Sequence, residues 1–504
     1  MKFNKEKFLG KYIMRGTALV YVLTVVAAAS VLFAGTIQFV VSHVKYNTSL
    51  EPDTQAIHVS EAGIYFYRWY LAHNVEGKTA TQIEEFWTNN PLGVDDNGDG
   101  DCDDADTADG DGDGTEAYIV DYEDENHNKI GQYKLCVTAP TEYSTVLNVK
   151  SQGSASSSGI NQERTISARL RKPSWSEFAI LANNRIRLSS GTEVYGPMHI
   201  NGGFHFDGIA HNIVTSSVSS YYDNDSDVRG WRSGVWAAAF PGFDNSEDVD
   251  DSEHFLAGKE FPVVAQDFNS VTANFDLMRE AAQAMGLYYG PEERGRFIEL
   301  GVPTSNQMRI TRVRKFNNNT LSITRLRNSD VDIVDIPDVG ILYVRDNVWI
   351  EGVLPAGKKL TVAAHSPDNG HEARIFLGAD DIVYEDRNSD SVLGLAAEGN
   401  IEFIRNSEGD LNASSGSDTE TLTIDAALLS QNGRVGRKYW SNNYKDTIEL
   451  YGSIATNNRM GFGYTDGTGF ETRNLIFDGN LLYQPPPLFP TGNSYAIDMW
   501  NSAD

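Results

Sequence analysis

The residues whose type and spacing best suit a chemical role are ten aspartates in the stretch DDNGDGDCDDADTADGDGDG, from Asp95 to Gly114. If Asp95 opens a twelve-residue loop, oxygen ligands fall at positions 1, 3, 5, 7, 9 and 12, supplied by Asp95, Asn97, Asp99, the backbone carbonyl of Asp101, Asp103 and Asp106. Gly100 falls at position 6, where a calcium loop turns sharply. The spacing therefore predicts a calcium site.

A second, partial loop follows, with Asp109, Asp111 and Asp113 as its ligands. Its twelfth position is Val120, so a late ligand would have to come from a neighbouring acidic residue, Glu116 or Asp121. Carboxylates this close repel one another unless a cation lies between them, and calcium accepts an all-protein shell more readily than magnesium does. The alternative is a solvated acidic linker, because residues 79–128 contain no Lys or Arg.

The chain has two cysteines, Cys102 within the aspartate-rich stretch and Cys136 after it. An extracellular setting would allow them to form a disulfide, which would fix the acidic segment to the next expected strand, Tyr133–Val137. Two unpaired thiols are the alternative.

Two other polar groups could form sites: His199, His205 and Asp207 around a glycine turn, and Asp380, Asp381 and Glu385. On a strand, histidines six residues apart would share a face and could hold a metal or transfer protons. A polar pair that stabilises a turn is the simpler interpretation, and acidic clusters are typical of surface turns. No nucleophile elbow, HExxH helix, phosphate-binding loop or CxxC pair occurs in the sequence, so we expect no enzymatic activity and no catalytic residue.

Composition sets the class of protein. A chain of 504 residues with a formal charge of −29 is expected to form two or three folded units and to bind no nucleic acid, because phosphate contacts need clustered Lys and Arg. Its 45 glycines against 16 prolines, with many Thr, Asn, Val and Ile, favour a mainly β structure with many turns.

One segment must position everything else. Thr17–Val41 carries no charge and no proline, and its 25 residues would span about 37 Å as a helix, enough for a hydrocarbon core of about 30 Å. Basic residues precede it, so the amino end is expected in the cytoplasm and everything after about His43 outside. A secretory signal cleaved after Ala29 is the alternative, but a chain starting at Ser30 would expose further apolar sequence.

The beginning of the chain resembles a known family. A basic leader ending in Arg15-Gly16, a TALV start, a long apolar helix and the later segment SEAGIYFYRWYLAHN resemble the amino-terminal family of the pilus-assembly protein PilX and related minor pseudopilins. The resemblance implies cleavage by a prepilin peptidase after Gly16, a mature start at Thr17, and a helix that packs against other pilin subunits in a filament. Tyr21 stands at the position where major pilins carry Glu. The absence of this Glu resembles minor subunits found at filament tips or in initiation complexes, and it argues against incorporation along the filament shaft.

The rest of the chain is expected to be β structure, with one helix at Ser270–Met285. Short strand-forming runs recur between turns: Arg185–Leu188, Glu193–Tyr195, Ile341–Val344, Asn347–Ile350, Lys359–Ala363, Ala373–Phe376, Ile401–Ile404, Thr421–Ile424 and Thr447–Leu450. Their turn–strand–turn rhythm favours a β-solenoid, although a β-sandwich stays open. Pro485-Pro486-Pro487, with Leu488, Phe489 and Trp500, is expected to strap or cap this domain. Ser151–Gly159 is either a hairpin tip or a small linker.

Five motifs from Val194 to Pro490, in order, resemble a bacterial surface-domain family usually described as a β-helix. We therefore expect a basic leader (1–16), a pilin-like helix (17–75), a calcium-loop insertion (76–136) and a β-helix-like extracellular domain (137–504). The expected function is that of a membrane-anchored minor pilin or pseudopilin that assists pilus assembly or adhesion, with other pilin subunits and a surface polysaccharide or host-cell ligand as its partners. A plain single-span anchor, a membrane-tethered carbohydrate-active β-helix enzyme and a structural envelope protein are the alternatives.

Overall fold

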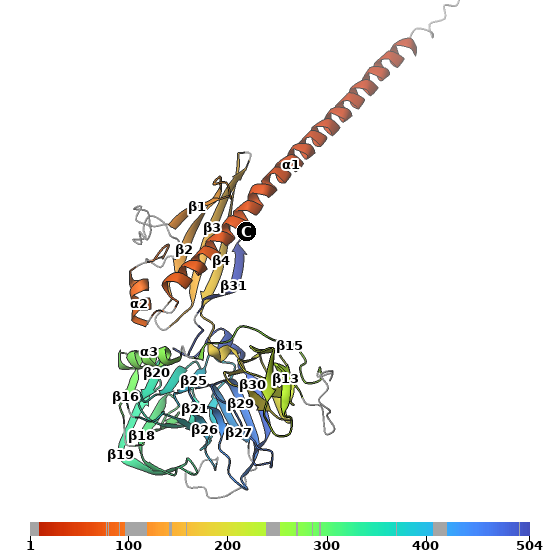
Figure 1. Ribbon diagram of the computed structural model, residues 1–504. Coiled ribbons are helices and arrows are strands. Elements are labelled where there is room, and N and C mark those ends of the chain that lie inside the picture. The colour runs from red at the N-terminus through yellow and green to blue at the C-terminus, as the bar shows by residue number, and fades with distance from the viewer. Residues whose placement is uncertain are drawn as a thin grey trace, which may run out of the picture.

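The computed structural model describes residues 10–76, 78, 80–89, 91–95, 118–140, 144–157, 159–237, 252–268, 271–284, 286–291, 294–368, 370–406, 421–492 and 494–503. In that part of the chain one long helix carries an antiparallel sheet, and a large β domain lies beyond the sheet (Figure 1).

Helix α1 (Gly10–Asn74) has two unlike halves. Nearly every described side chain between residues 18 and 45 is exposed, although most are apolar. From Pro52 onward, buried side chains recur at helical spacing, among them Ala56, Val59, Ile64, Tyr67 and Leu71. By length and composition α1 could cross a membrane, although a signal sequence or the core helix of a soluble protein passes the same test. None of the most apolar window of α1 is buried inside the protein. The expected helix over the apolar segment is confirmed.

The antiparallel sheet has the order β1-β2-β3-β4-β31. Its strands are β1 (Tyr118–Glu123), β2 (Lys129–Thr138), β3 (Leu147–Ser157), β4 (Ile160–Arg171) and β31 (Ala496–Ala503). A separate apolar core, including Val59, Leu135, Val149 and Leu170, joins its inner face to the covered half of α1. The short helix α2 (Ala80–Thr88) follows α1. Ser151–Ser157 forms the outer half of β3 and pairs with β4 as far as Ser157 beside Ile160, so this stretch belongs to a hairpin and is not a linker.

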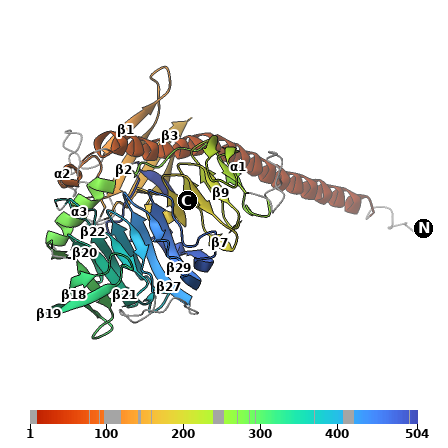
Figure 2. The same ribbon diagram turned by 60° about the horizontal axis from the view of Figure 1, so that its bottom comes forward.

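The large β domain is built on parallel ladders (Figure 2). The first ladder runs, in spatial order, β16 (Leu287–Tyr289), β20 (Val339–Val344), β22 (Lys359–Ala364), β25 (Val392–Ala397), β27 (Thr421–Ser430), β29 (Tyr444–Thr456), β5 (Ile180–Ala182), β8 (Met198–Ile200), β11 (Val214–Ser216) and β15 (Lys259–Glu260). A second ladder contains β17 (Arg296–Leu300), β21 (Val348–Leu354), β23 (Ile375–Leu377), β26 (Ile401–Phe403) and β28 (Val435–Arg437).

A third ladder joins the end of β21 to β24 (Ile382–Tyr384), the first parts of β27 and β29, β30 (Gly469–Phe477), β7 (Thr192–Tyr195) and β10 (Ile209–Ala210). The remaining strands are β6 (Ile186–Leu188), β9 (Phe204–Phe206) and β14 (Val235–Trp236), which pair in parallel, and the antiparallel pairs β12 (Ser220–Asp223) with β13 (Gly230–Ser233) and β18 (Gln307–Phe316) with β19 (Ile323–Asp335). Val362, Leu395, Leu428 and Ile454, one from each of four successive rungs, are fully buried in the largest core. Every strand run expected from sequence in this domain overlaps an observed strand.

The chain enters and leaves this domain at adjacent strands. It enters at β5, which pairs with the later strand β29 (Ile454 beside Ile180), and winds outward to β15. Helix α3 (Val271–Ala284), close to the expected Ser270–Met285, then leads to β16 at the other end of the ladder, and the chain returns rung by rung to β29. Because entry and exit are neighbours, the whole domain fits between β4 and β31 without breaking the antiparallel sheet.

This topology differs from two sequence expectations. The expected domain boundary at residue 137 falls inside β2, and β3, β4 and β31 belong to the sheet that packs on α1. The proline segment is also divided: Phe489 is buried with Trp175 against the large domain and Thr361 donates a hydrogen bond to Pro487 O (2.6 Å), whereas Trp500 lies on β31 beside Tyr65 of α1. The segment therefore straps the large domain without Trp500, because β31 takes Trp500 back to the first sheet. The 3-10 helices η2 (Trp175–Glu177) and η4 (Gly479–Leu482) lie near entry and exit.

Candidate functional site

The predicted calcium loop is described only at its edge. Asp95 is 8 % exposed, and its backbone N–H donates to Val137 O at 2.9 Å, while the Val137 N–H donates to Gly93 O at 2.7 Å. The first predicted ligand is therefore fixed to β2. Asn97, Asp99, Asp101, Asp103, Asp106, Asp109, Asp111 and Asp113 lie outside the described residues. Within the described residues no group of three or more His, Cys, Asp or Glu is arranged to hold a metal ion, so the calcium site stays a prediction.

Cys136 lies on β2 next to Val137 and is disulfide-bonded. Cys102 lies outside the described residues, so its pairing with Cys136 stays a prediction. Gly16 and Thr17 both lie within α1, and nothing in the structure tests cleavage between them.

The two histidines occupy different strands, with the glycine turn between them. His199 on β8 contacts Thr215 Oγ1 through Nδ1 (2.9 Å) and Asn201 Oδ1 through Nε2 (3.0 Å), and burial lowers its pKa. His205 Nε2 on β9 contacts Asp207 Oδ1 at 2.8 Å, and the His205 ring stacks on Trp236 with ring centroids 3.9 Å apart. They do not share a face, since the turn redirects the chain into another sheet. Each ring is held by local polar partners, which is the simpler of the two interpretations.

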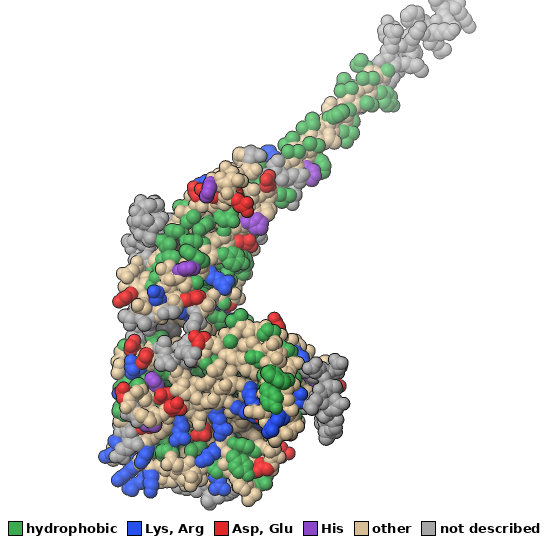
Figure 3. Space-filling model, viewed as in Figure 1, with side chains coloured by type: hydrophobic (Ala, Val, Ile, Leu, Met, Phe, Trp, Pro, Cys, Tyr) green, Lys and Arg blue, Asp and Glu red, His purple; other side chains and the backbone are tan. Residues whose placement is uncertain are grey.

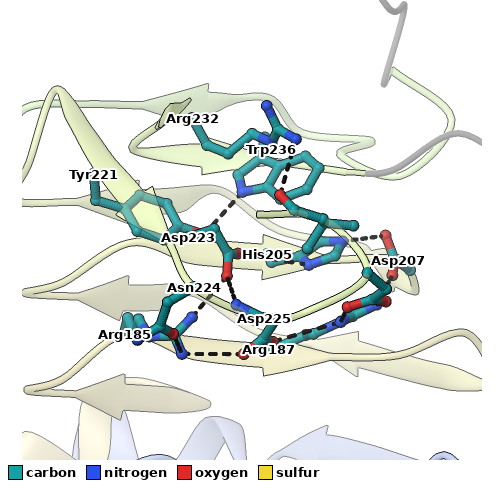
Figure 4. A network of polar contacts seen from close by, with 12 residues as sticks. Arg185, Arg187, His205, Asp207, Tyr221, Asp223, Asn224, Asp225, Arg232 and Trp236 are labelled. Carbon is teal, nitrogen blue, oxygen red and sulfur yellow. Dashed lines mark hydrogen bonds and ion pairs between the residues drawn. The ribbon is translucent and has the colours of Figure 1, made fainter. Parts of the chain in front are cut away.

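His205 borders a network of polar contacts that clamps the turn after β12 (Figure 4). Arg185 pairs with Asp223 (2.8 Å) and Asp225 (3.0 Å), and Arg459 reaches Asp225 with both terminal nitrogens (2.8 and 2.9 Å). Burial alone would raise the pKa of Asp225, but hydrogen bonds and charge from Arg459 and Arg185 outweigh it and hold that pKa far below its usual range. These carboxylates are therefore occupied by guanidinium groups, and the network fixes the β12–β13 hairpin onto the ladder.

On the hairpin itself, Tyr222 and Trp231 form an exposed cross-strand aromatic pair, with ring centroids 5.9 Å apart. Sequence reasoning did not find this network, because Arg459 and Asp225 are far apart in the chain.

The cluster Asp380, Asp381 and Glu385 consists of turn-stabilising side chains. Asp380 Oδ1 accepts the Asp381 N–H (2.8 Å), Asp381 Oδ1 accepts the Thr423 N–H (2.8 Å), and Glu385 Oε2 accepts the Ala356 N–H (3.1 Å). Each carboxylate thus satisfies a backbone donor, as surface turns require.

A neighbouring pair of carboxylates is not apparent from the sequence. Glu299 and Glu351 lie side by side on β17 and β21. Burial, together with Asp380 and Glu299, raises the pKa of Glu351 to about 7. Only the parallel pairing brings these residues together, so spacing along the chain gave no signal.

Comparison with known proteins adds little. No protein-family model matches the chain, and no curated protein matches it. A solved structure, the competence-associated pilin ComZ from Thermus thermophilus, aligns over 90 % of this chain and 97 % of its own with 13 % identity and a TM-score of 0.26. That score is too low to transfer a fold or a function, so the function proposed for this chain rests on its own contacts.

Proposed function

We propose that this chain is a membrane-anchored, pilin-like subunit that displays its large β domain outside the cell. The division of α1 carries the proposal. Large apolar side chains of its first half, such as Leu23, Phe33 and Phe39, are each about 70 % exposed, while its second half is covered by the antiparallel sheet (Figure 1). An uncharged helix of this length is stable only where lipid or other helices cover it. Both partners are those that the PilX-like resemblance implies.

The topology supports display of the β domain. Because it is inserted between β4 and β31, the α1–sheet unit can dock on a membrane or a filament while the inserted domain projects from it. We infer that this domain is a β-solenoid, in which each coil adds a rung to each ladder, and that it serves adhesion or assembly rather than catalysis. Tyr21, where major pilins carry Glu, favours a place at a filament tip or in an initiation complex.

The first prediction concerns processing and display. Mass spectrometry of the protein from cell envelopes should find Thr17 at the amino terminus, because the leader ends at Gly16 before an uncharged helix. Protease added to intact cells should remove the β domain, since it lies beyond the anchor on the side away from the basic leader.

Gly16→Val should retain the leader, whereas Gly35→Ala, where an added Cβ meets nothing within 4 Å, should be processed normally. An intact Met1 would support a plain anchor, and a start at Ser30 a secreted chain; either result contradicts the pilin-like proposal. Full protection from protease, with no outer barrier to explain it, would reverse the topology.

We further propose that the aspartate-rich segment binds calcium. Support comes from the spacing of its oxygens and from the described edge of the loop, where Asp95 and the disulfide-bonded Cys136 are both held at β2. A free acidic linker would lose conformational entropy when it orders around an ion. Because the first ligand and the following strand are already fixed, this segment would lose less.

Calorimetric titration of the full chain in detergent should therefore show calcium binding, and saturation at a hundred times Kd should stabilise the fold by about 2.7 kcal/mol. Asp99→Ala should weaken binding at least tenfold, whereas Asp390→Ala, an exposed aspartate of the β domain, should leave it unchanged. Absence of both heat and a shift in unfolding temperature at millimolar calcium would make the segment an acidic linker only.

A further inference from the structure

Lys and Arg are concentrated in one hairpin of this acidic chain. Residues 300–329 contain no Asp or Glu but hold six cations: Arg309, Arg312, Arg314, Lys315, Arg325 and Arg327. All six lie on β18 and β19, the antiparallel hairpin at one end of the ladders. In a chain of net charge −29, such a run is a local reversal of sign.

Two of these cations form ion pairs with residues that the structure describes, and four do not. Arg309 pairs with Glu299 (3.1 Å) and Arg312 with Asp330 (3.4 Å). Arg314, Lys315, Arg325 and Arg327 are exposed and form no ion pair with any residue that the structure describes. We call these four residues the basic hairpin surface.

A β-bulge gathers the four charges. Val313 pairs with Leu326 and Lys315 with Arg325, so Arg314 is the extra residue of the bulge and both it and Lys315 are exposed. Lys315 and Arg325 are direct cross-strand partners, about 5 Å apart at Cα. Two like charges in that position destabilise a sheet unless an anion lies between them. Arg327 lies two residues further along β19, about 7 Å from Arg325.

The hairpin is a firm support for these charges. Its inner side chains Phe316 and Leu326 pack against a buried cluster that includes Trp349 and Phe376, with the rings of Phe316 and Trp349 5.0 Å apart. The loop between the strands is held by two indole N–H groups, from Trp349 to Leu321 O (2.9 Å) and from Trp440 to Asn319 O (2.6 Å). The cations therefore start from a largely fixed backbone, which lowers the entropy lost on binding.

The position of the hairpin limits its partner. Figure 1 places β18 and β19 at the end of the large domain remote from the apolar half of α1, and Figure 3 shows blue side chains gathered at that corner. The surface therefore faces away from the membrane that would hold α1. With the chain displayed as proposed above, it meets the polymers outside the cell.

We propose that the basic hairpin surface binds an acidic polysaccharide through its carboxylates, an inference that rests on the proposed display. The guanidinium group of Arg is a planar fork that matches a carboxylate. The Cα spacings of about 5 Å (Lys315 to Arg325) and about 7 Å (Arg325 to Arg327) suit carboxylates spread along a sugar chain. Duplex nucleic acid carries a charge every 1.7 Å or so, which is much denser than the spacing of these cations. Single strands need exposed aromatic rings for stacking, whereas Phe316 of this hairpin packs inward.

Charged side chains also protect the edge of a sheet, and β19 pairs only with β18 among the described strands. That role alone predicts that removing the charges causes aggregation without affecting any ligand. The two roles therefore differ in measurable outcomes.

The test uses the full chain in detergent and polygalacturonate as the probe, with neutral dextran for comparison. Changing Arg314, Lys315, Arg325 and Arg327 together to Gln should weaken polygalacturonate binding at least tenfold, and added salt should weaken binding by the wild type. The matched control changes four exposed cations elsewhere, Lys78, Lys150, Arg229 and Lys438, to Gln; it alters net charge equally and should change affinity less than twofold. Unfolding temperatures of both variants verify folding.

Several results would overturn the inference. Equal losses in both variants would show a net-charge effect, and tighter binding of duplex DNA of matched charge would show a phosphate surface. A change in oligomeric state of the first variant, by light scattering, would identify a second copy as the partner, and aggregation with binding retained would leave edge protection as the only role. Failure of binding in a chain that is correctly processed and protease-accessible on cells rejects this inference alone.

Discussion

Gly153→Val is expected to separate α1 from its sheet and to destabilise that unit by about 3 kcal/mol, the upper range for an overpacked core. A Cβ at residue 153 would be 2.2 Å from the carbonyl oxygen of Ala56 and 2.4 Å from the backbone nitrogen of Ser60. Both are backbone atoms of the helix, so no rotamer change can relieve the clash and α1 itself must move. Gly63 and Gly131 lie in the same close contact between helix and sheet.

The measurement is chemical unfolding of the full chain in detergent, with limited proteolysis to identify which unit opens first. The transition of the α1–sheet unit should move to lower denaturant, while the large β domain, which has its own core, should unfold as in the wild type. Gly290→Val is the control, because nothing lies within 4 Å of a Cβ there. An unchanged first transition would mean that α1 does not pack on β3 as closely as the structure has it.

Arg171→Met should loosen the junction between the two units at a cost of about 3 kcal/mol, because it leaves the largely covered carboxylate of Glu177 without its guanidinium partner and Asp498 with only one of its two. Arg171 ends β4, is 9 % exposed, and binds both Glu177 of η2 and Asp498 of the returning strand β31. Arg169 donates two further hydrogen bonds to the carboxylate of Asp498 (2.7 and 2.9 Å). One guanidinium thus ties the strand that leaves the sheet to the strand that comes back.

The same junction predicts a pH dependence. Burial by itself raises the pKa of Asp498, but hydrogen bonds from Arg169 and Arg171 outweigh it and lower the pKa below its ordinary value. A carboxyl whose pKa is lower in the folded state contributes stability that is present above about pH 4 and is lost as the pH falls through the folded pKa. The free energy of unfolding should therefore fall less steeply in Arg171→Met than in the wild type when the pH is lowered from 6 to 3.

Lys129→Met is the matched control on the same sheet. Its ion pair with Asp121 is about half exposed on both sides, so its loss should cost less than about 1 kcal/mol. If the two variants lose similar stability, the buried cluster at Arg171 does not hold the junction.

The sequence by itself determined the local elements. The uncharged run Thr17–Val41 lies in a helix, the runs rich in β-branched residues lie in strands, and Ser270–Met285 contains α3, because each of these depends on propensity and on the periodicity of nearby residues. The sequence also proposed the calcium loop and the cleavage site, which are patterns of adjacent residues and stay predictions.

Only the tertiary structure decided how those elements combine. Parallel pairing places Ile180 beside Ile454 and Glu299 beside Glu351, and neither partnership leaves a trace in local spacing. The expected boundary at residue 137 missed the sheet on α1, because β31 returns to it after the whole β domain has been inserted. The bulge at Arg314 likewise turns an ordinary basic run into one exposed surface. Local side-chain pattern sets what a segment becomes, whereas long-range backbone pairing sets which segments meet.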